Sequence, residues 1–206
     1  MRLSRLRLIR ATAALTAILA ATPVPGAEPK PDAKVPSAAQ PLAAAPAVAP
    51  AAPAPRSEDV ATPEALVAAL YDVISGPKGQ ARDWNRFRSL FAPGARMIPS
   101  GKRPDGAQGY FVLTPEEYIT RSEKLLVESG FRERELHRVV ERFGPLVHVF
   151  SSYEGRREGD TQPFVRGINS IQAVHDGKRW WLLTVAWTAE TPDQPLPAKY
   201  LPPLKR

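Results

Sequence analysis

Residues 164–190 read FVRGINSIQAVHDGKRWWLLTVAWTAE, and this stretch decides the fold class. The dipeptide Asp176-Gly177 near its centre is typical of a two-residue turn in a β-hairpin, and strand-like apolar segments flank it on both sides. We therefore predict two antiparallel strands, over 164–175 and 179–190, that are joined at this turn.

The alternating pattern starts further upstream, at Phe131, and predicts two more strands before the hairpin. A glycine next to proline or aspartate marks a turn after each of them. Four consecutive antiparallel strands therefore make up the second half of the predicted domain. The additional strands cover 131–143 and 146–157, with turns at Gly144-Pro145 and Gly159-Asp160.

Apolar residues recur at helical spacing before Phe131, and each predicted helix starts at a capping residue. These residues are Thr62 before Pro63, Asp83, and Thr114 in a capping box with Glu117. The predicted helices run from Pro63 to Ser75, from Asp83 to the Pro93-Gly94 pair, and from Pro115 to Glu128. Between the second and third helices we predict a strand over 95–99, a loop over 100–109 and a strand over 110–113.

Helices followed by hairpin-linked strands describe an α+β domain. We predict a curved antiparallel sheet with the N-terminal helices packed on its concave face. The proline-rich tail, 192–203, cannot continue a sheet because proline lacks the N–H group that strand pairing needs. We expect Tyr200, Leu201 and Leu204 to pack back onto the domain.

Residues 1–27 have the composition of a secretory signal peptide. Four arginines lie within the first ten residues, an apolar run follows over 11–21, and small residues lead to Ala27. The apolar run is shorter than the roughly 20 residues that cross a bilayer, so we expect no stable membrane insertion after signal cleavage. Cleavage near Ala21 stays open beside cleavage after Ala27. The predicted location is periplasmic or secreted.

Residues 28–56 consist mainly of proline and alanine and contain no aromatic residue. Such a segment cannot offset the entropy of ordering, so we predict a disordered linker followed by one domain, 57–206. Most of the net charge of +7 lies before this domain, which itself contains 21 Lys/Arg and 19 Asp/Glu. We therefore expect no nucleic-acid partner.

The absence of cysteine excludes disulfides, thiol nucleophiles, thiolate metal sites and lipid-modified cysteines. The sequence also contains no phosphate-binding glycine loop, no dinucleotide fingerprint and no serine nucleophile elbow. The histidines His137, His148 and His175 lack metal-ligand spacing and an accompanying acidic cluster. We predict no metal site and no cofactor.

Two groups of residues stand in the order expected of a known family. Trp84 to Phe91 on a helix lead through Ala92-Pro93-Gly94-Ala95 into a strand, and Gly167 to Gln172 precede the Asp176-Gly177 turn and Trp180 to Trp187. Over about 62–190 the chain resembles the nuclear-transport-factor-2-like superfamily, which includes ketosteroid isomerase and polyketide-cyclase-like proteins. The resemblance implies a cone-shaped half-barrel with a pocket between sheet and helices, and often dimers through the sheet. It implies no reaction, because one fold hosts unrelated functions.

The resemblance allows one comparison, with the carboxylate base and oxyanion donors of ketosteroid isomerase. In such enzymes the first strand ends in the acidic base, whereas the matching stretch here, Met97-Ile98-Pro99-Ser100, has no carboxylate. Tyr71 stands where that family places an oxyanion donor, and without a base we interpret it as a half-buried core tyrosine. Proton abstraction by the usual arrangement is therefore not expected.

Four residues are candidates for ligand binding: Tyr118, His148, Asn169 and Trp187. Asn169 is polar within an otherwise apolar strand, and a buried amide needs partners, such as a ligand, a dimer contact or an internal hydrogen bond. His148 lies between apolar neighbours, as a pocket acid or base or as a satisfied core histidine. We identify no catalytic residue.

The last predicted strand is apolar on both faces if it alternates, with Trp181, Leu183, Val185 and Trp187 on one face and Trp180, Leu182, Thr184 and Ala186 on the other. Helices can cover one face, so we predict a homodimer through the outer face, with cover by the proline-rich tail as the alternative. The strand from Phe131 alternates arginine with glutamate, which favours a solvated, self-paired edge strand over an anion site.

These observations predict an exported domain that binds a small hydrophobic ligand or acts as a scaffold, without a recognisable catalytic set. The alternative is an isomerase- or cyclase-like enzyme that acts on a small hydrophobic substrate in the cone pocket, using His148 or Tyr118 with Asn169. A third interpretation is an interaction module whose linker and tail bind partners. The sequence does not decide whether the protein is an enzyme.

Overall fold

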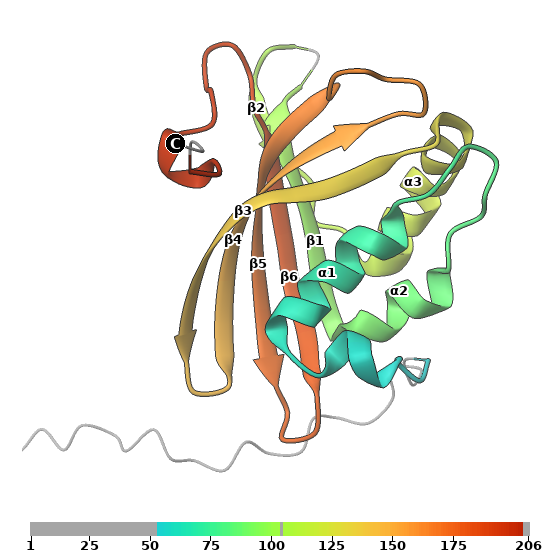
Figure 1. The fold of residues 1–206 in the computed structure, drawn as a ribbon, viewed down its shortest axis with the longest axis vertical. Coiled ribbons are helices and arrows are strands. Elements are labelled where there is room, and N and C mark those ends of the chain that lie inside the picture. Colours follow the sequence, from blue (N-terminus) through green and yellow to red (C-terminus); the bar gives the residue numbers. More distant parts are fainter. Residues whose placement is uncertain (1–52, 104, 204–206) are drawn as a thin grey trace, which may run out of the picture. The chain divides into compact units, whose positions relative to one another are not determined.

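The computed structural model describes residues 53–103 and 105–203 and is drawn as a ribbon in Figure 1. The predicted signal peptide and its cleavage site, nearly all of the predicted linker, and Leu204 lie outside the described residues. Within these ranges the chain forms the predicted α+β domain. Its helices are α1 (Pro63–Ile74), α2 (Trp84–Leu90) and α3 (Pro115–Ser129), and its 3₁₀ turns are η1 (Ser57–Val60) and η2 (Ala198–Tyr200).

The helices begin at the capping residues that the sequence indicates. The side chains of Thr62 and Asp83 accept hydrogen bonds from the backbone N–H groups three residues later, in the first turns of α1 and α2. Thr114 and Glu117 form the predicted capping box of α3, and Gly130 ends this helix in a left-handed conformation. Each cap satisfies N–H groups that lack a partner within the helix, and its loss costs about 1 kcal/mol.

The strands of the described domain form one curved sheet: β1 (Phe91–Lys102), β2 (Gln108–Tyr110), β3 (Arg132–Phe143), β4 (Leu146–Arg156), β5 (Val165–His175) and β6 (Trp180–Ala189). Their order is β2-β1-β6-β5-β4-β3. The four C-terminal strands pair antiparallel, as predicted, but β1 pairs with β6 in parallel, so the sheet is mixed. The prediction of an entirely antiparallel sheet is wrong here because no hairpin joins β1 to β6 and dictates their direction.

The segment between α2 and α3 differs from the prediction. Helix α2 ends at Leu90, and β1 already begins at Phe91 and runs through the Pro93-Gly94 pair. A register shift against β6 accommodates this pair, since proline cannot donate to strand pairing. The end of β1 then pairs with β2, so part of the predicted loop 100–109 is strand and the predicted strand 110–113 is displaced.

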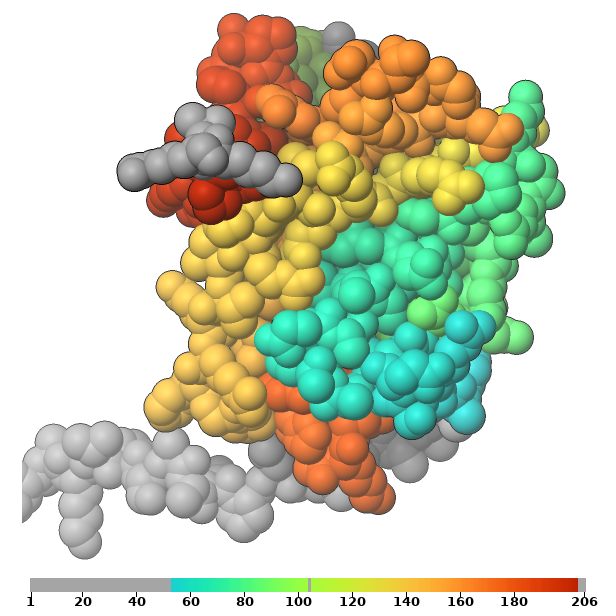
Figure 2. Space-filling model, viewed as in Figure 1, coloured from blue at the N-terminus to red at the C-terminus, as the bar shows by residue number. Residues whose placement is uncertain are grey.

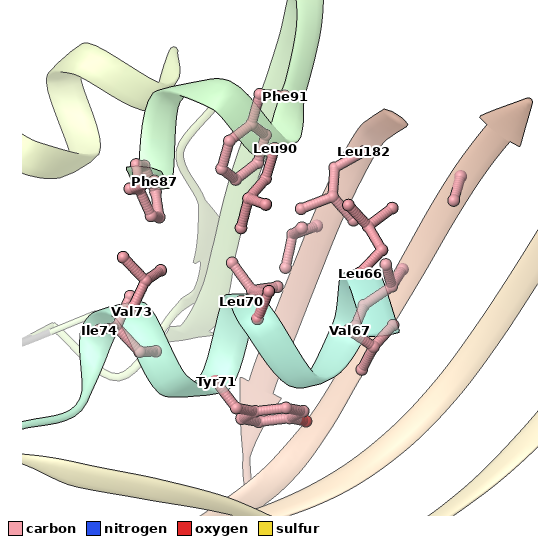
Figure 3. Packing of buried hydrophobic residues seen from close by; sticks show 14 of the residues in the cluster. Leu66, Val67, Leu70, Tyr71, Val73, Ile74, Phe87, Leu90, Phe91 and Leu182 are labelled. Carbon is pink, nitrogen blue, oxygen red and sulfur yellow. The ribbon is translucent and has the colours of Figure 1, made fainter. Parts of the chain in front are cut away.

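Helix α1 packs its apolar side onto the inner, concave face of the sheet, which Figure 3 shows from close by. Leu66 and Val67 are fully buried, and Leu70 is nearly so. Leu182 of β6 and Phe87 of α2 complete this contact, and in Figure 2 α1 lies at the surface beside β3. Burying one such side chain contributes about 1.5–3 kcal/mol, so this layer holds the helices on the sheet.

Strand β6 does not alternate along its whole length. Its register against β5 shifts by one residue at Leu183. Trp180 and Leu182 therefore belong to the buried core together with Val185, whereas Trp181 lies on the other face. The prediction assigned the tryptophans to the two sheet faces by strict alternation. It is wrong because a bulge moves every side chain beyond it to the opposite face.

The proline-rich tail covers part of the outer face of the sheet. The ring centroid of Tyr200 lies 4.9 Å from that of Phe150, and the Ser152 hydroxyl donates to the Tyr200 carbonyl oxygen at 2.5 Å. The Glu190 carboxylate holds the start of the tail through the backbone N–H of Leu196. The predicted packing of the tail is therefore confirmed for Tyr200, and the tail and the sheet together line an open pocket of about 390 Å³.

Gly167 in β5 leaves no room for a side chain, and we predict that Gly167→Ala destabilises the domain. A Cβ atom there would lie 2.6 Å from Tyr153 Oη and closer still to the carbonyl oxygen of Thr188. Overpacking of this kind costs about 1–3 kcal/mol, which chemical denaturation of the full chain would measure. Gly101→Ala is the control, because a Cβ at Gly101 meets no atom within 4 Å. Equal losses in both variants would contradict the prediction.

Candidate functional site

A cavity of about 320 Å³ lies between α1, α3 and the inner face of the sheet. Most of its wall is apolar and includes side chains from both helices and from β1 and β6, among them Leu70, Ile74, Met97, Leu126 and Val185. Polar groups interrupt this wall at a few positions. They include Tyr71, Tyr118, Glu133, Tyr153 and Asn169.

Three of the four predicted ligand-binding residues line this cavity. Tyr118 comes from α3, Asn169 from β5 and Trp187 from β6. The rings of Tyr118 and Trp187 meet edge to face, with their centroids 6.0 Å apart. The fold thus brings together residues that are far apart in the sequence, and their role in binding stays a prediction.

His148, the fourth predicted residue, is not part of the cavity wall. Its neighbours Val147 and Val149 are buried in the core, so alternation along β4 directs His148 to the outer face. There its Nε2 atom lies 2.9 Å from Ser170 Oγ on β5. The prediction of a pocket histidine is corrected accordingly: the apolar neighbours of His148 mark the opposite face of its own strand.

Two glutamates of β3 are directed to the interior, although we expected a solvated edge strand. The strand is at the edge of the sheet, as predicted, but Glu133 lines the cavity and Glu135 bonds to a buried serine. The register against β4 shifts between Glu135 and His137, so Leu136 is an extra residue. Arg138 therefore falls on the same face as Glu135, and the two form an ion pair.

A chain of hydrogen bonds joins the two glutamates along the cavity wall. Ser151 Oγ lies 2.5 Å from Glu135 Oε1 and 2.8 Å from Tyr71 Oη. Asn169 Nδ2 donates to Tyr71 Oη at 3.0 Å and to Glu133 Oε1 at 3.2 Å. Helix α1 and the strands β3, β4 and β5 are thereby linked through side chains alone.

The ion-paired Glu135 determines which group donates and which accepts in each of these hydrogen bonds. A carboxylate only accepts hydrogen bonds, so Ser151 donates its single proton to Glu135, and Tyr71 donates its own to Ser151. Tyr71 in turn accepts from Asn169, whose second amide proton goes to Glu133. Tyr71 therefore has no proton left for a ligand, and Asn169 retains only its Oδ1 acceptor.

Glu133 has an unusual acidity for a glutamate. Burial raises its pKa from 4.5 to about 7, and the hydrogen bond from Asn169 offsets only part of this effect. Burial also raises the pKa values of Tyr71, Tyr118 and Tyr153, and the nearby Glu133 charge adds to the shift. A carboxyl group that is half protonated near pH 7 thus faces the cavity beside neutral phenols.

The chemistry of the site follows from these groups. In the described part of the chain, no cluster of three or more histidine, aspartate or glutamate side chains could hold a metal ion. Residues 53–103 and 105–203 also contain no helix that is long and apolar enough to cross a membrane. The cavity offers a mostly apolar wall, free hydrogen-bond acceptors at Glu133 and Asn169, and one carboxyl group that titrates near pH 7.

Glu133 is the candidate that the sequence analysis missed. The only local feature that could have indicated its burial is strand alternation, because Glu133 lies between Arg132 and Arg134, which are both exposed. Arginine and glutamate along the rest of β3 resemble a solvated edge strand, and the extra residue Leu136 disrupts a simple face assignment. Its position in the cavity wall depends on helices α1 and α3, which the strand sequence does not reveal.

Comparisons with known proteins identify similar folds. No protein-family model and no curated protein matches the chain. A protein of unknown function with a cystatin-like fold from Nostoc punctiforme is 15% identical, with a TM-score of 0.46 over 64% of this chain and 90% of that one. A nuclear-transport-factor-2-like protein of unknown function from Silicibacter pomeroyi is 15% identical, with a TM-score of 0.44 over 63% and 94%. These names agree with the predicted resemblance, which is one of fold.

We predict that Glu133→Gln changes how stability depends on pH. Folding raises the pKa of Glu133 from 4.5 to about 7, so the folded state binds this proton more tightly and the wild-type chain loses stability between these pH values as the pH rises. Glutamine does not titrate. Relative to the wild type, the variant should therefore gain up to about 3 kcal/mol between pH 5 and pH 8.

Urea unfolding of the full chain at both pH values measures this gain. Glu141→Gln is the matched control, because Glu141 is exposed on the same strand. If the difference in unfolding free energy between Glu133→Gln and the wild type is the same at pH 5 and pH 8, the Glu133 carboxyl has an ordinary pKa.

Proposed function

We propose that this domain binds a small, largely apolar molecule in the cavity between α1, α3 and the sheet. The observation that carries the proposal is the cavity itself, with a volume of about 320 Å³, mostly apolar walls and a few polar groups. Small-molecule sites in proteins typically have this size and composition.

Apolar contacts would supply most of the affinity, and the polar groups would orient the ligand. Leu70, Met97 and Trp187 contribute apolar wall from three different elements. Asn169 and Glu133 have acceptor capacity that the internal hydrogen bonds do not use, whereas Tyr71 is fully engaged. These properties support a ligand with an apolar body and one polar group.

The proposal includes export to the periplasm or the medium, which rests on the signal-like sequence of residues 1–27.

The proposal also includes a homodimer through the outer face of the sheet. Phe143 and Leu146 are exposed at the β3–β4 turn, and Trp181 is only half-buried on the same face. The proline-rich tail covers the other end of this face, so a second copy would contact the uncovered end.

A second candidate function is proton transfer in the same cavity, as in an isomerase- or cyclase-like enzyme. The observation that favours it is Glu133, a cavity carboxyl whose pKa is raised to about 7. A general base works best when its pKa is near the operating pH. In this alternative Glu133 takes the role that the sequence analysis considered for His148.

For the binding function, we predict that the full chain binds the neutral fluorophore N-phenyl-1-naphthylamine saturably and increases its emission. Ser122→Phe should weaken binding at least about tenfold, because the added ring would occupy cavity space from α3. Thr120→Phe is the matched control, two residues earlier and exposed on the same helix. Identical binding by both variants and the wild type would place the dye elsewhere and contradict the proposal.

For the enzyme alternative, we predict that the full chain accelerates exchange of hydrogen for deuterium beside the carbonyl of 2-tetralone in D₂O, measured by proton NMR. Glu133→Gln should slow the exchange by about 10²-fold or more, which is the usual contribution of a general base. Glu141→Gln should leave it unchanged. Exchange at the solvent rate with the wild type would count against the enzyme and would leave the binding function standing.

A further inference from the structure

Two glutamates on β3 differ in how their charge is balanced. Glu135 pairs with Arg138 and accepts a hydrogen bond from Ser151. Glu133, two residues earlier, lines the cavity and accepts one hydrogen bond, from Asn169. Within the described part of the chain, no ion pair includes Glu133 and its second carboxyl oxygen has no hydrogen-bond partner. That oxygen is also not fully enclosed by protein atoms.

Aromatic rings surround the cavity near this carboxyl. The phenols of Tyr71, Tyr118 and Tyr153 are close enough for the charge of Glu133 to raise their pKa values. Trp187 packs edge to face on Tyr118, 6.0 Å between centroids. Because the faces of aromatic rings attract cations, an unbalanced carboxylate among such rings is complementary to a positively charged ligand.

We infer that the ligand is a small organic cation, a protonated amine on an apolar body, whose ammonium group pairs with Glu133 and Oδ1 of Asn169. The inference rests on the proposed binding function and adds the charge of the ligand. An ammonium group only donates hydrogen bonds, and the internal hydrogen bonds leave these two groups as acceptors. A carboxylate ligand would instead meet the like charge of Glu133.

The charged and titratable groups around Glu133 do not supply this cation. Arg157 contributes to the cavity wall, but it is exposed and lies over the ring of Phe164, 4.0 Å from its centroid. Burial keeps the surrounding phenols neutral at pH 7. The groups that face Glu133 from the elements packed against it are Tyr71 (α1), Tyr118 (α3), Tyr153 (β4) and the Glu135–Arg138 pair (β3).

The test is an NMR titration of the full chain with three probes that share a phenyl ring: 2-phenylethylamine, 2-phenylethanol and phenylacetate. At pH 8 the amine should bind about tenfold more tightly than the alcohol, and phenylacetate most weakly. Glu133 must be ionised to pair with the amine, and its pKa is about 7, so amine binding should weaken about tenfold from pH 8 to pH 6. Alcohol binding should not change over this range.

Glu133→Gln should remove the preference for the amine and keep alcohol binding, whereas Glu141→Gln should keep both. If Glu133→Gln does not fold, the pH dependence of amine binding by the wild type still tests the inference. Equal affinity for amine and alcohol at pH 8 would overturn the inference and leave the binding function intact. Failure of all three probes to shift cavity resonances would contradict the binding function together with the inference.

Discussion

Strand β3 contains one residue more than its partner strand, and this bulge determines on which face its charged side chains lie. The extra residue follows Glu135, so Arg138 shares the inner face with Glu133 and Glu135. In a regularly alternating strand, Arg138 would lie on the opposite face and Glu135 would lack its partner. The hydrogen bonds from Ser151 through Tyr71 to Asn169 take their direction from that ion pair, so the polarity of the cavity depends on the bulge.

The same strand therefore carries two carboxyl groups with different physical roles. Glu135 has a charged partner and hydrogen bonds, which offset the cost of removing it from water. Glu133 lacks a charged partner among the described residues, and burial raises its pKa to about 7. The ion pair of Glu135 explains its presence inside the fold. Ionised Glu133 destabilises the fold unless a molecule in the cavity interacts with it, and this difference motivates both a ligand and a proton-transfer role.

Much of the domain could be predicted from local patterns. The caps at Thr62, Asp83 and Thr114 mark the starts of the helices, because a side chain must satisfy the free N–H groups of the first turn. Alternation and the Asp176-Gly177 turn place the four C-terminal strands within about a residue at each end. Tyr118, Asn169 and Trp187 are candidates that the sequence analysis named, and the packing of α3 on the sheet brings all three to the cavity wall.

The sequence by itself determined where the helices start, which segments are strands, and that a covered sheet face contains polar residues, because these properties depend on neighbours a few positions away. Only the tertiary structure decided the rest. The bulges at Leu136 and Leu183 depend on pairing with other strands, and they set the faces of the residues beyond them. The parallel pairing of β1 with β6, the outward position of His148 and the burial of Glu133 likewise depend on elements distant in the chain, since the environment of a side chain is set by everything that packs around it.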